Sequence, residues 1–134
     1  MMSEEKNIDK TKALRTRKIN QIIAKTKAKM EILGTYKIEF DATIRRYAEM
    51  TYQYKQTQDE WYANGCQITE EYTNKAGYTN IRKTALYIAL ETLRKELLEL
   101  ENVLGLTPKG LKQLRSDGFK GKQISALDKV LMNV

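Results

Sequence analysis

The chain has 134 residues, of which 41% are hydrophobic and 31% charged, with a single proline and a formal net charge of +7. This length fits one domain with extended arms and leaves little room for a second independent core. One cysteine and no histidine exclude an intrachain disulfide and a Cys/His zinc site, and they fit a reducing cytosol.

The first predicted element is a basic helix or arm over residues 1–33. Strong helix formers fill Asp9 to Leu33 without glycine or proline. Apolar residues recur at helical spacing only from about Ile19 onward, so we expect the first dozen residues to be disordered until they meet a partner.

Positive charge is concentrated at the two ends of the chain. The net charge is +6 over residues 1–30, −3 over residues 31–104 and +4 over residues 105–134. Clustered lysine and arginine attract a polyanion, and double-stranded DNA is the obvious candidate, although a solvated helix face is the alternative. The basic residues expected to contact DNA are Lys10, Lys12, Arg15, Arg17, Lys18, Lys25, Lys27 and Lys29.

A second helix is predicted from Tyr36 to Ala63, between Gly34 and Asn64-Gly65. Its heptad seam is rich in aromatic residues and consists of Phe40, Ile44, Tyr47, Thr51, Tyr54, Gln58 and Trp61. Arg45 and Arg46 on this helix are further candidates for contact with phosphate or a neighbouring subunit. An ion pair with Glu49 on the same helix is an equal alternative.

Residues 65–81 break the helical pattern and predict a short β-hairpin or ordered loop around Asn74 and Gly77. A third helix follows from about Arg82 to Leu104. Its leucine stripe steps by four and three residues and consists of Leu86, Leu90, Leu93, Leu97, Leu100 and Leu104. The stripe either packs antiparallel on the aromatic helix of the same chain, which we expect as its main role, or forms a subunit interface.

Gly105 ends the leucine helix, and Thr107-Pro108 then predicts the start of a short helix that runs to about Arg115. Residues 34–115 would thus form the helical core and oligomerisation domain. Residues 116–134 read as a flexible glycine-containing linker and a short amphipathic tail that docks on another surface.

Chemistry typical of enzymes is missing from the sequence. It contains no phosphate-binding glycine loop and no nucleophile paired with histidine, and adjacent carboxylates such as Asp59 and Glu60 point to different faces of a helix. We therefore expect no catalytic residues, metal or cofactor. Without a long apolar stretch or a secretory signal, the chain is expected to be soluble, in contact with no membrane, and located in a cytoplasm.

Three stretches resemble one known family, the phage terminase small subunits. They are YTNKAGYTNIRKTALYIAL at 72–90, LGLTPKGLKQL at 104–114 and, more weakly, YKIEFDATIRRYAEMTYQY at 36–54. The LGLTP sequence after a long leucine helix is the most specific of these features. The lysine-rich first 30 residues depart from the proline-rich opening of many relatives, and a proline often expected near Ala85 is missing.

The resemblance implies a mainly α protein in which long antiparallel helices are joined by the hairpin. It also implies a ring-type homo-oligomer that recognises viral DNA when packaging begins and recruits or regulates the large ATPase and nuclease subunit. The alternative from another class is a coiled-coil structural or scaffolding phage protein, which would use the same heptads without needing basic ends.

Overall fold

The structure, a computed structural model, describes residues 2–118 of the chain. It is mainly helical, and its one sheet within these residues has two antiparallel strands. The elements in chain order are α1 (Met2–Leu33), the 3-10 helix η1 (Ile38–Phe40), α2 (Asp41–Ala63), β1 (Thr69–Thr73), β2 (Thr79–Lys83), α3 (Ala85–Val103) and α4 (Pro108–Ser116). The predicted helices and hairpin are therefore confirmed, whereas most of the predicted linker and the tail lie outside the described residues.

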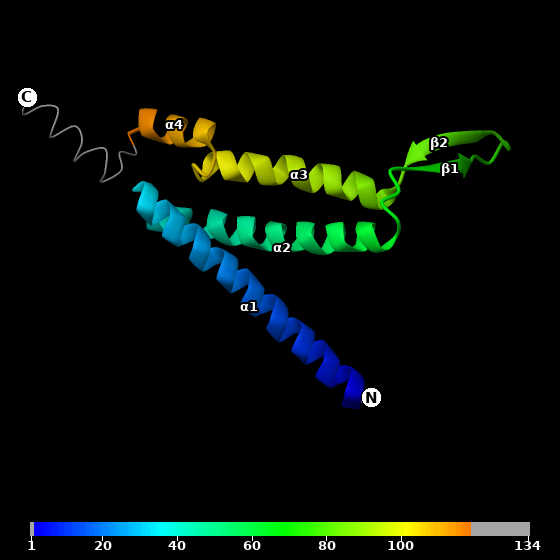
Figure 1. The fold of residues 1–134 in the computed structure, drawn as a ribbon, viewed down its shortest axis with the longest axis horizontal. Coiled ribbons are helices and arrows are strands. Elements are labelled where there is room, and N and C mark those ends of the chain that lie inside the picture. Colours follow the sequence, from blue (N-terminus) through cyan, green and yellow to red (C-terminus); the bar gives the residue numbers. More distant parts are fainter. Residues whose placement is uncertain (1, 119–134) are drawn as a thin grey trace, which may run out of the picture.

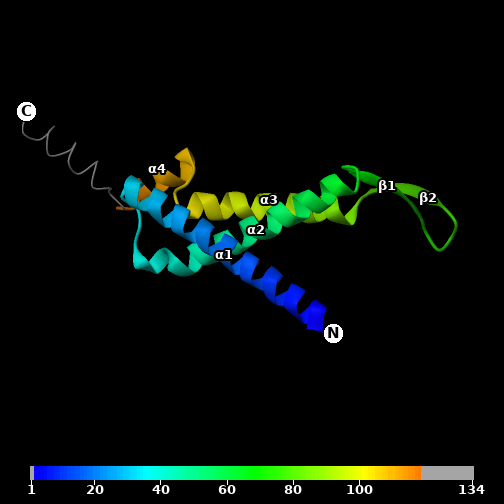
Figure 2. The same cartoon turned by 60° about the horizontal axis from the view of Figure 1, so that its bottom comes forward.

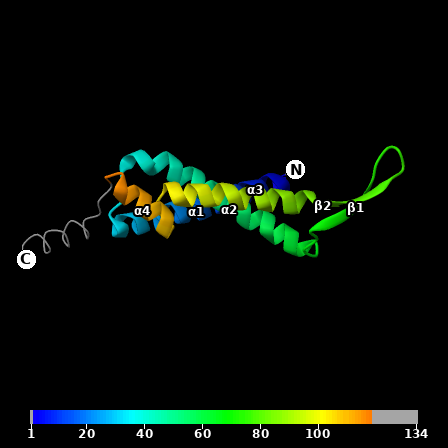
Figure 3. The same cartoon turned by 90° about the horizontal axis from the view of Figure 1, so that it is seen from above.

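Helices α2 and α3 lie side by side and antiparallel, and the hairpin projects from the end where they are joined (Figure 1). Helix α1 crosses α2 at the opposite end of this pair, and its N-terminal half extends away from the other helices (Figures 1 and 2). Seen from above, the described part of the chain is elongated, with α4 at one end and the hairpin at the other (Figure 3). This shape leaves both the arm and the hairpin open to partners.

The leucine stripe packs within the chain. Leu90, Leu97 and Leu104 are buried, and the alternate stripe residues Leu86, Leu93 and Leu100 are partly buried. This pattern is expected when a neighbouring helix packs against only one side of the leucine stripe of α3. Alternate leucines of the stripe are thus buried within the chain, and partial exposure of the other three leaves a flank uncovered.

The aromatic seam of α2 contributes less to the core than its composition suggests. The buried residues of α2 are Ile44 and Ala48, of which only the first lies on the predicted seam. Phe40 and Tyr47 pack at the edge of a cluster formed by Met30, Ile44 and Leu104. Large rings fit between helices only at the rim, whereas a small alanine allows the helix backbones to approach.

The hairpin starts and ends with specific turn chemistry. Asn74 accepts hydrogen bonds through its Oδ1 from the backbone N–H groups of Ala76 and Tyr78, both at 3.0 Å, and Gly77 has a positive φ of 86°. This is the three-residue loop in which glycine takes the left-handed position. At the base, Thr84 caps α3 by accepting from the N–H of Tyr87, so α3 begins at Ala85 and not near Arg82 as predicted.

The first helix is longer than predicted, because α1 begins at Met2. The expectation of disorder in the first dozen residues rested on the missing apolar face. Strong helix formers continue through this segment, and Glu4 and Glu5 in the first turn interact favourably with the helix dipole. Local propensity thus produces a helix there without any packing face.

Helix α4 folds back tightly on the end of α3. Thr107 accepts at its Oγ1 from the N–H of Gly110 and donates to the side-chain oxygen of Asn102. Gly110 is buried, and a Cβ atom at this position would lie 2.2 Å from the carbonyl oxygen of Asn102. A glycine is required here by the close approach of the two backbones, since its φ is not in the left-handed range.

Candidate nucleic-acid interface

The basic residues of α1 project into solvent. Lys10, Lys12, Arg15, Arg17, Lys18, Lys25 and Lys29 are exposed, and none of them forms an ion pair with the residues that the structure describes. Their charge is therefore available to an external anion. They do not share one face, however, because their spacing distributes them around the helix.

Three lysines converge on a groove between α1 and α2. The groove has a volume of about 610 Å³, and its basic lining residues are Lys18 and Lys25 from α1 and Lys55 from α2. Asp59 on the same groove pairs with Lys55 at 3.2 Å, so two of the three ammonium groups have no acidic partner among the described residues. The groove wall also carries Leu14, Ile22 and Tyr52, among others.

A smaller hollow of about 360 Å³ lies next to the groove, nearer the C-terminus of α1, and shares Lys25 with it. Lys25 and Lys29 line it, together with Tyr47 and Glu101. Burial and the nearby Glu101 carboxylate raise the pKa of Tyr47, so this hydroxyl remains a neutral donor and acceptor at physiological pH. Lys18, Lys25 and Lys29 thus form a row, spaced by seven and four residues, along the edge of the α1–α2 contact.

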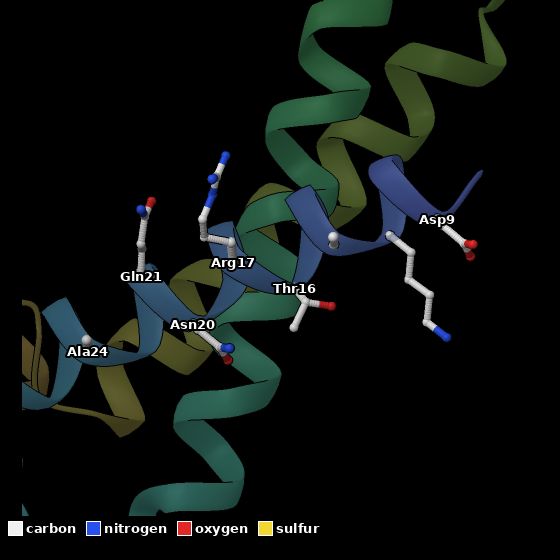
Figure 4. Close-up of a pocket in the computed structure, with 8 residues that line it drawn as sticks. Asp9, Thr16, Arg17, Asn20, Gln21 and Ala24 are labelled. Carbon is white, nitrogen blue, oxygen red and sulfur yellow. The ribbon is translucent and has the colours of Figure 1, made fainter. Parts of the chain in front are cut away.

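A third surface lies on the outer side of α1, and all of its lining residues belong to this one helix (Figure 4). Lys12 and Arg17 supply the positive charge there, and the residues beside them are mostly small or polar. In Figure 4, Arg17 and Gln21 project together from one side of the helix, while Thr16 and Asn20 project from the other. Amide, hydroxyl and guanidinium groups are the donors that proteins use toward phosphate oxygens.

Lys27 differs from the other predicted contacts. Its Nζ lies 3.5 Å from the carboxylate of Asp41 and 5.8 Å from the centre of the Tyr36 ring. These contacts join α1 to the start of α2. We therefore assign Lys27 a structural part at the junction, and we expect it to contribute less to anion binding than the other basic residues.

Arg45 and Arg46 are exposed on α2, and no ion pair with Glu49 is formed among the described residues. Neither arginine lines the two hollows that hold the α1 lysines. They remain candidates, separate from the lysine row. Lys55 was missed by sequence reasoning, since its one acidic neighbour at i+4 makes it resemble an ordinary helix-surface pair.

Within residues 2–118, no group of three or more histidine, cysteine or acidic side chains is placed to hold a metal ion. None of their helices combines the length and apolar character needed to cross a membrane.

A family model described as phage terminase, small subunit, matches residues 13–118 of the chain. The matched range covers most of α1, every lining residue of the two hollows except Thr11, and the whole of the α2–hairpin–α3 unit. No curated protein and no solved structure shows a significant match to the chain.

Proposed function

Because the chain belongs to the phage terminase small subunit family, and so has a role in phage DNA packaging, we propose that it binds double-stranded viral DNA through α1 and recruits or regulates the large subunit. The observation that carries the DNA-binding part is the set of unpaired lysines along the α1–α2 groove. We propose no catalytic role for the chain.

The charge arrangement supports binding to the phosphate backbone. The groove brings together ammonium groups from two helices, and the exposed residues Lys10, Lys12, Arg15 and Arg17 extend the positive surface along the arm. A helix of 32 residues is about 48 Å long at 1.5 Å per residue, which exceeds one turn of B-DNA. The arm can therefore contact several successive phosphates.

We further propose that copies assemble into a ring. Ile88, Leu98 and Val103 on α3 are each about half exposed, at 49%, 54% and 51%. Together with the partly buried leucines of the stripe, they offer apolar surface that the chain does not cover itself. A ring of head-to-tail copies would cover it and would place many basic arms on one DNA molecule, which multiplies their affinity.

Recruitment of the large subunit is assigned to the C-terminal segment on sequence grounds. Residues 119–134 lie outside the described residues, so the supporting argument is the amphipathic pattern behind a glycine-containing linker. Residues 34–115 would then form the assembly domain between a DNA-binding end and a docking end.

The test of DNA binding replaces the groove lysines Lys18, Lys25 and Lys55 with glutamine. Each neutralised phosphate contributes roughly 0.9 to the slope of log affinity against log salt. We expect the variant to bind every duplex more weakly and to show a slope shallower by up to about 2.7 per copy that contacts DNA. Gel-shift or anisotropy titrations at several salt concentrations measure both quantities.

Arg45→Gln with Arg46→Gln is the matched control, because these changes remove charge from α2 without altering the groove. Helix content and oligomer mass should equal those of the wild type in both variants. An unchanged slope in the groove variant combined with a shallower slope in the control would move the DNA contact to the outer face of α2 and refute the proposed interface.

A further inference from the structure

The outer surface of α1 carries polar side chains that the chain itself does not use. Asn20 and Gln21 are exposed, and neither side chain forms a hydrogen bond with the described residues. The hydroxyls of Thr11 and Thr26 each donate to the carbonyl oxygen four residues earlier, whereas the hydroxyl of Thr16 forms no such bond. These donors and acceptors are therefore available to an external partner.

The same surface is hollowed along the helix and covered by nothing. Its volume is about 720 Å³, and all of its lining residues come from α1, so no other element of residues 2–118 lies over it. Ala13 and Ala24 are among the lining residues (Figure 4). Their short side chains allow a partner to approach the helix backbone closely.

Three of these side chains form a polar strip, Arg17, Asn20 and Gln21, that faces away from the body of the protein. At about 100° per residue, Gln21 lies about 40° to one side of Arg17 around the helix axis, and Asn20 lies about 60° to the other side. The buried residue Thr26 lies about 180° from Arg17 on the same basis. A partner that approaches α1 from outside therefore meets the polar strip first.

Positive charge flanks the polar strip on both sides. Lys18 and Lys25, which line the groove between α1 and α2, lie about 100° and 80° from Arg17 on the side of Gln21. Lys12 lies on the side of Asn20, about 140° from Arg17. None of the three lysines forms an ion pair among the described residues. This order, with amides in the middle and cations at the margins, matches a duplex groove, in which base edges lie between two rows of phosphates.

We infer that the polar strip reads base edges in the major groove of double-stranded DNA, while the flanking lysines contact phosphates. The major groove admits an α-helix, and arginine pairs there with O6 and N7 of guanine, whereas asparagine and glutamine pair with N6 and N7 of adenine. Arg17 and Gln21 are separated by about 6 Å along the helix axis, close to two base-pair steps of roughly 3.4 Å. Each copy would thus read two or three adjacent base pairs. This inference rests on the proposed DNA binding through α1 and assigns its sequence preference to three residues.

Base edges suit this surface better than phosphates do. Asp9 also lines it and has no ion-pair partner among the described residues. A carboxylate repels phosphate, whereas it accepts a hydrogen bond from the amino group of cytosine. The amides of Asn20 and Gln21 carry no charge, so they add nothing to the release of counterions that drives phosphate binding. The strip therefore has the chemistry of discrimination, and the lysines have the chemistry of affinity.

The first test removes the two amides without changing the charge of the protein. The full-length wild type is used to select duplexes from a pool with a randomised central region. Asn20→Ala combined with Gln21→Ala is then titrated with a selected duplex and with a scrambled duplex of equal composition. A base contact contributes roughly 5- to 150-fold to preference, so the ratio of the two affinities should fall by at least about fivefold. The affinity for the scrambled duplex and its salt slope should stay at the wild-type values.

Gln53→Ala combined with Gln113→Ala is the matched control, because it removes two exposed amides from other helices. Alanine favours helices, so both double variants should keep the wild-type helix content. The control should also keep the wild-type ratio of affinities. An unchanged ratio in the strip variant would overturn the inference, and so would an equal loss of affinity for both duplexes, which would indicate contact with phosphates alone.

The second test concerns Arg17 and the groove that it enters. Replacing guanine by 7-deazaguanine in the selected duplex removes the N7 acceptor from the major groove without altering base pairing. This change should weaken binding of the wild type and leave that of Arg17→Lys unaltered, because lysine keeps the charge but lacks the planar fork that pairs with guanine. Equal weakening of the two proteins would overturn the assignment of Arg17.

The selection itself distinguishes this inference from the proposed function. A wild type that binds duplexes but selects no common sequence would overturn the base-reading strip and leave the proposed DNA binding in place. A wild type that binds no duplex, even at low salt, would contradict the proposed DNA binding as well.

Discussion

The two halves of α1 belong to one continuous helix of similar composition, yet they stand in different environments. In the C-terminal half, Thr26 and Met30 are buried against α2 and the end of α3. In the N-terminal half, Ile8 and Leu14 are 66% and 39% exposed, and the helix extends away from the body (Figure 1). The C-terminal half is held by tertiary packing, whereas the N-terminal half is held by its own propensity.

The residues that stabilise the fold therefore lie in the C-terminal half of α1, whereas the N-terminal half offers residues for binding a partner. Basic residues occur in both halves, but only the C-terminal half has an apolar row at helical spacing. A helix without a packing face is stabilised only weakly, by short-range interactions. We therefore expect changes in the packed regions to lower the stability of the fold, and changes in the free half to affect binding alone.

The largest effect is expected from a charge introduced into the leucine seam. Leu90→Asp combined with Leu97→Asp places two carboxylates where the wild-type side chains are buried, and unpaired buried charge costs several kcal/mol at each position. We expect loss of the cooperative fold and of most helical circular dichroism. Ile8→Asp combined with Leu14→Asp is the matched control in the free half of α1. Retention of wild-type helicity by the seam variant would show that α2 and α3 do not depend on this contact.

A smaller effect is expected at the packed half of α1. Met30→Ala removes a fully buried side chain from the cluster with Ile44 and Leu104, and such truncations cost about 2–5 kcal/mol. Ile8→Ala, at a residue that is 66% exposed, should change the free energy of unfolding by less than about 0.5 kcal/mol. Urea denaturation of both variants, at one protein concentration, measures the two values. Equal losses in the two variants would mean that the free half is also packed, against a neighbouring copy.

Sequence reasoning succeeded where periodicity carries the information. The leucine steps include Leu90 and Leu97, the two buried residues of α3, and Asn74 with Gly77 predicted the hairpin, because both signals are local and physically specific. The start of α3 was misplaced because Arg82 and Lys83 continue β2 until Thr84 caps the helix. The leucine stripe begins only at Leu86, so its periodicity does not mark where the helix starts.

The parts that were missed depend on how elements meet in space. Lys55 lies on the groove only because α1 crosses α2 at a particular position, and nothing in its own neighbourhood indicates the lysines of α1. Ala48 is buried although it lies off the predicted heptad seam, whose pattern drew attention to larger residues. The involvement of Lys27 with Asp41 was hidden for the same reason, since the two residues are brought together by the turn between α1 and α2.

The smallest effect is expected from a change in the turn between α1 and α2, where specific polar contacts hold the packed half of α1. The hydroxyl of Tyr36 donates to Asp41 at 2.7 Å, and Lys27 from α1 approaches the same carboxylate. The hydrogen bond from Tyr36, supported by the charge of Lys27, lowers the pKa of Asp41 below its ordinary value of 3.8. The same hydrogen bond raises the pKa of Tyr36 above its ordinary value of 10.0.

The signs of the two shifts define a pH window. The lowered pKa of Asp41 contributes stability above about pH 3.8, and this stability is lost as the pH falls through the pKa of Asp41 in the folded protein. The raised pKa of Tyr36 contributes stability below about pH 10, and this stability is lost as the pH rises through the pKa of Tyr36 in the folded protein. Tyr36→Phe should therefore lower stability by a small and constant amount between about pH 5 and pH 9 and approach the wild type at lower pH. Tyr52→Phe is the control, because Tyr52 accepts from the neutral amide of Gln56 and has no carboxylate partner in the described residues. Unfolding curves measured from pH 9 to below pH 3 decide the matter: a difference between Tyr36→Phe and wild type that persists unchanged below pH 3 would show that the hydroxyl stabilises the junction independently of the ionised Asp41 carboxylate.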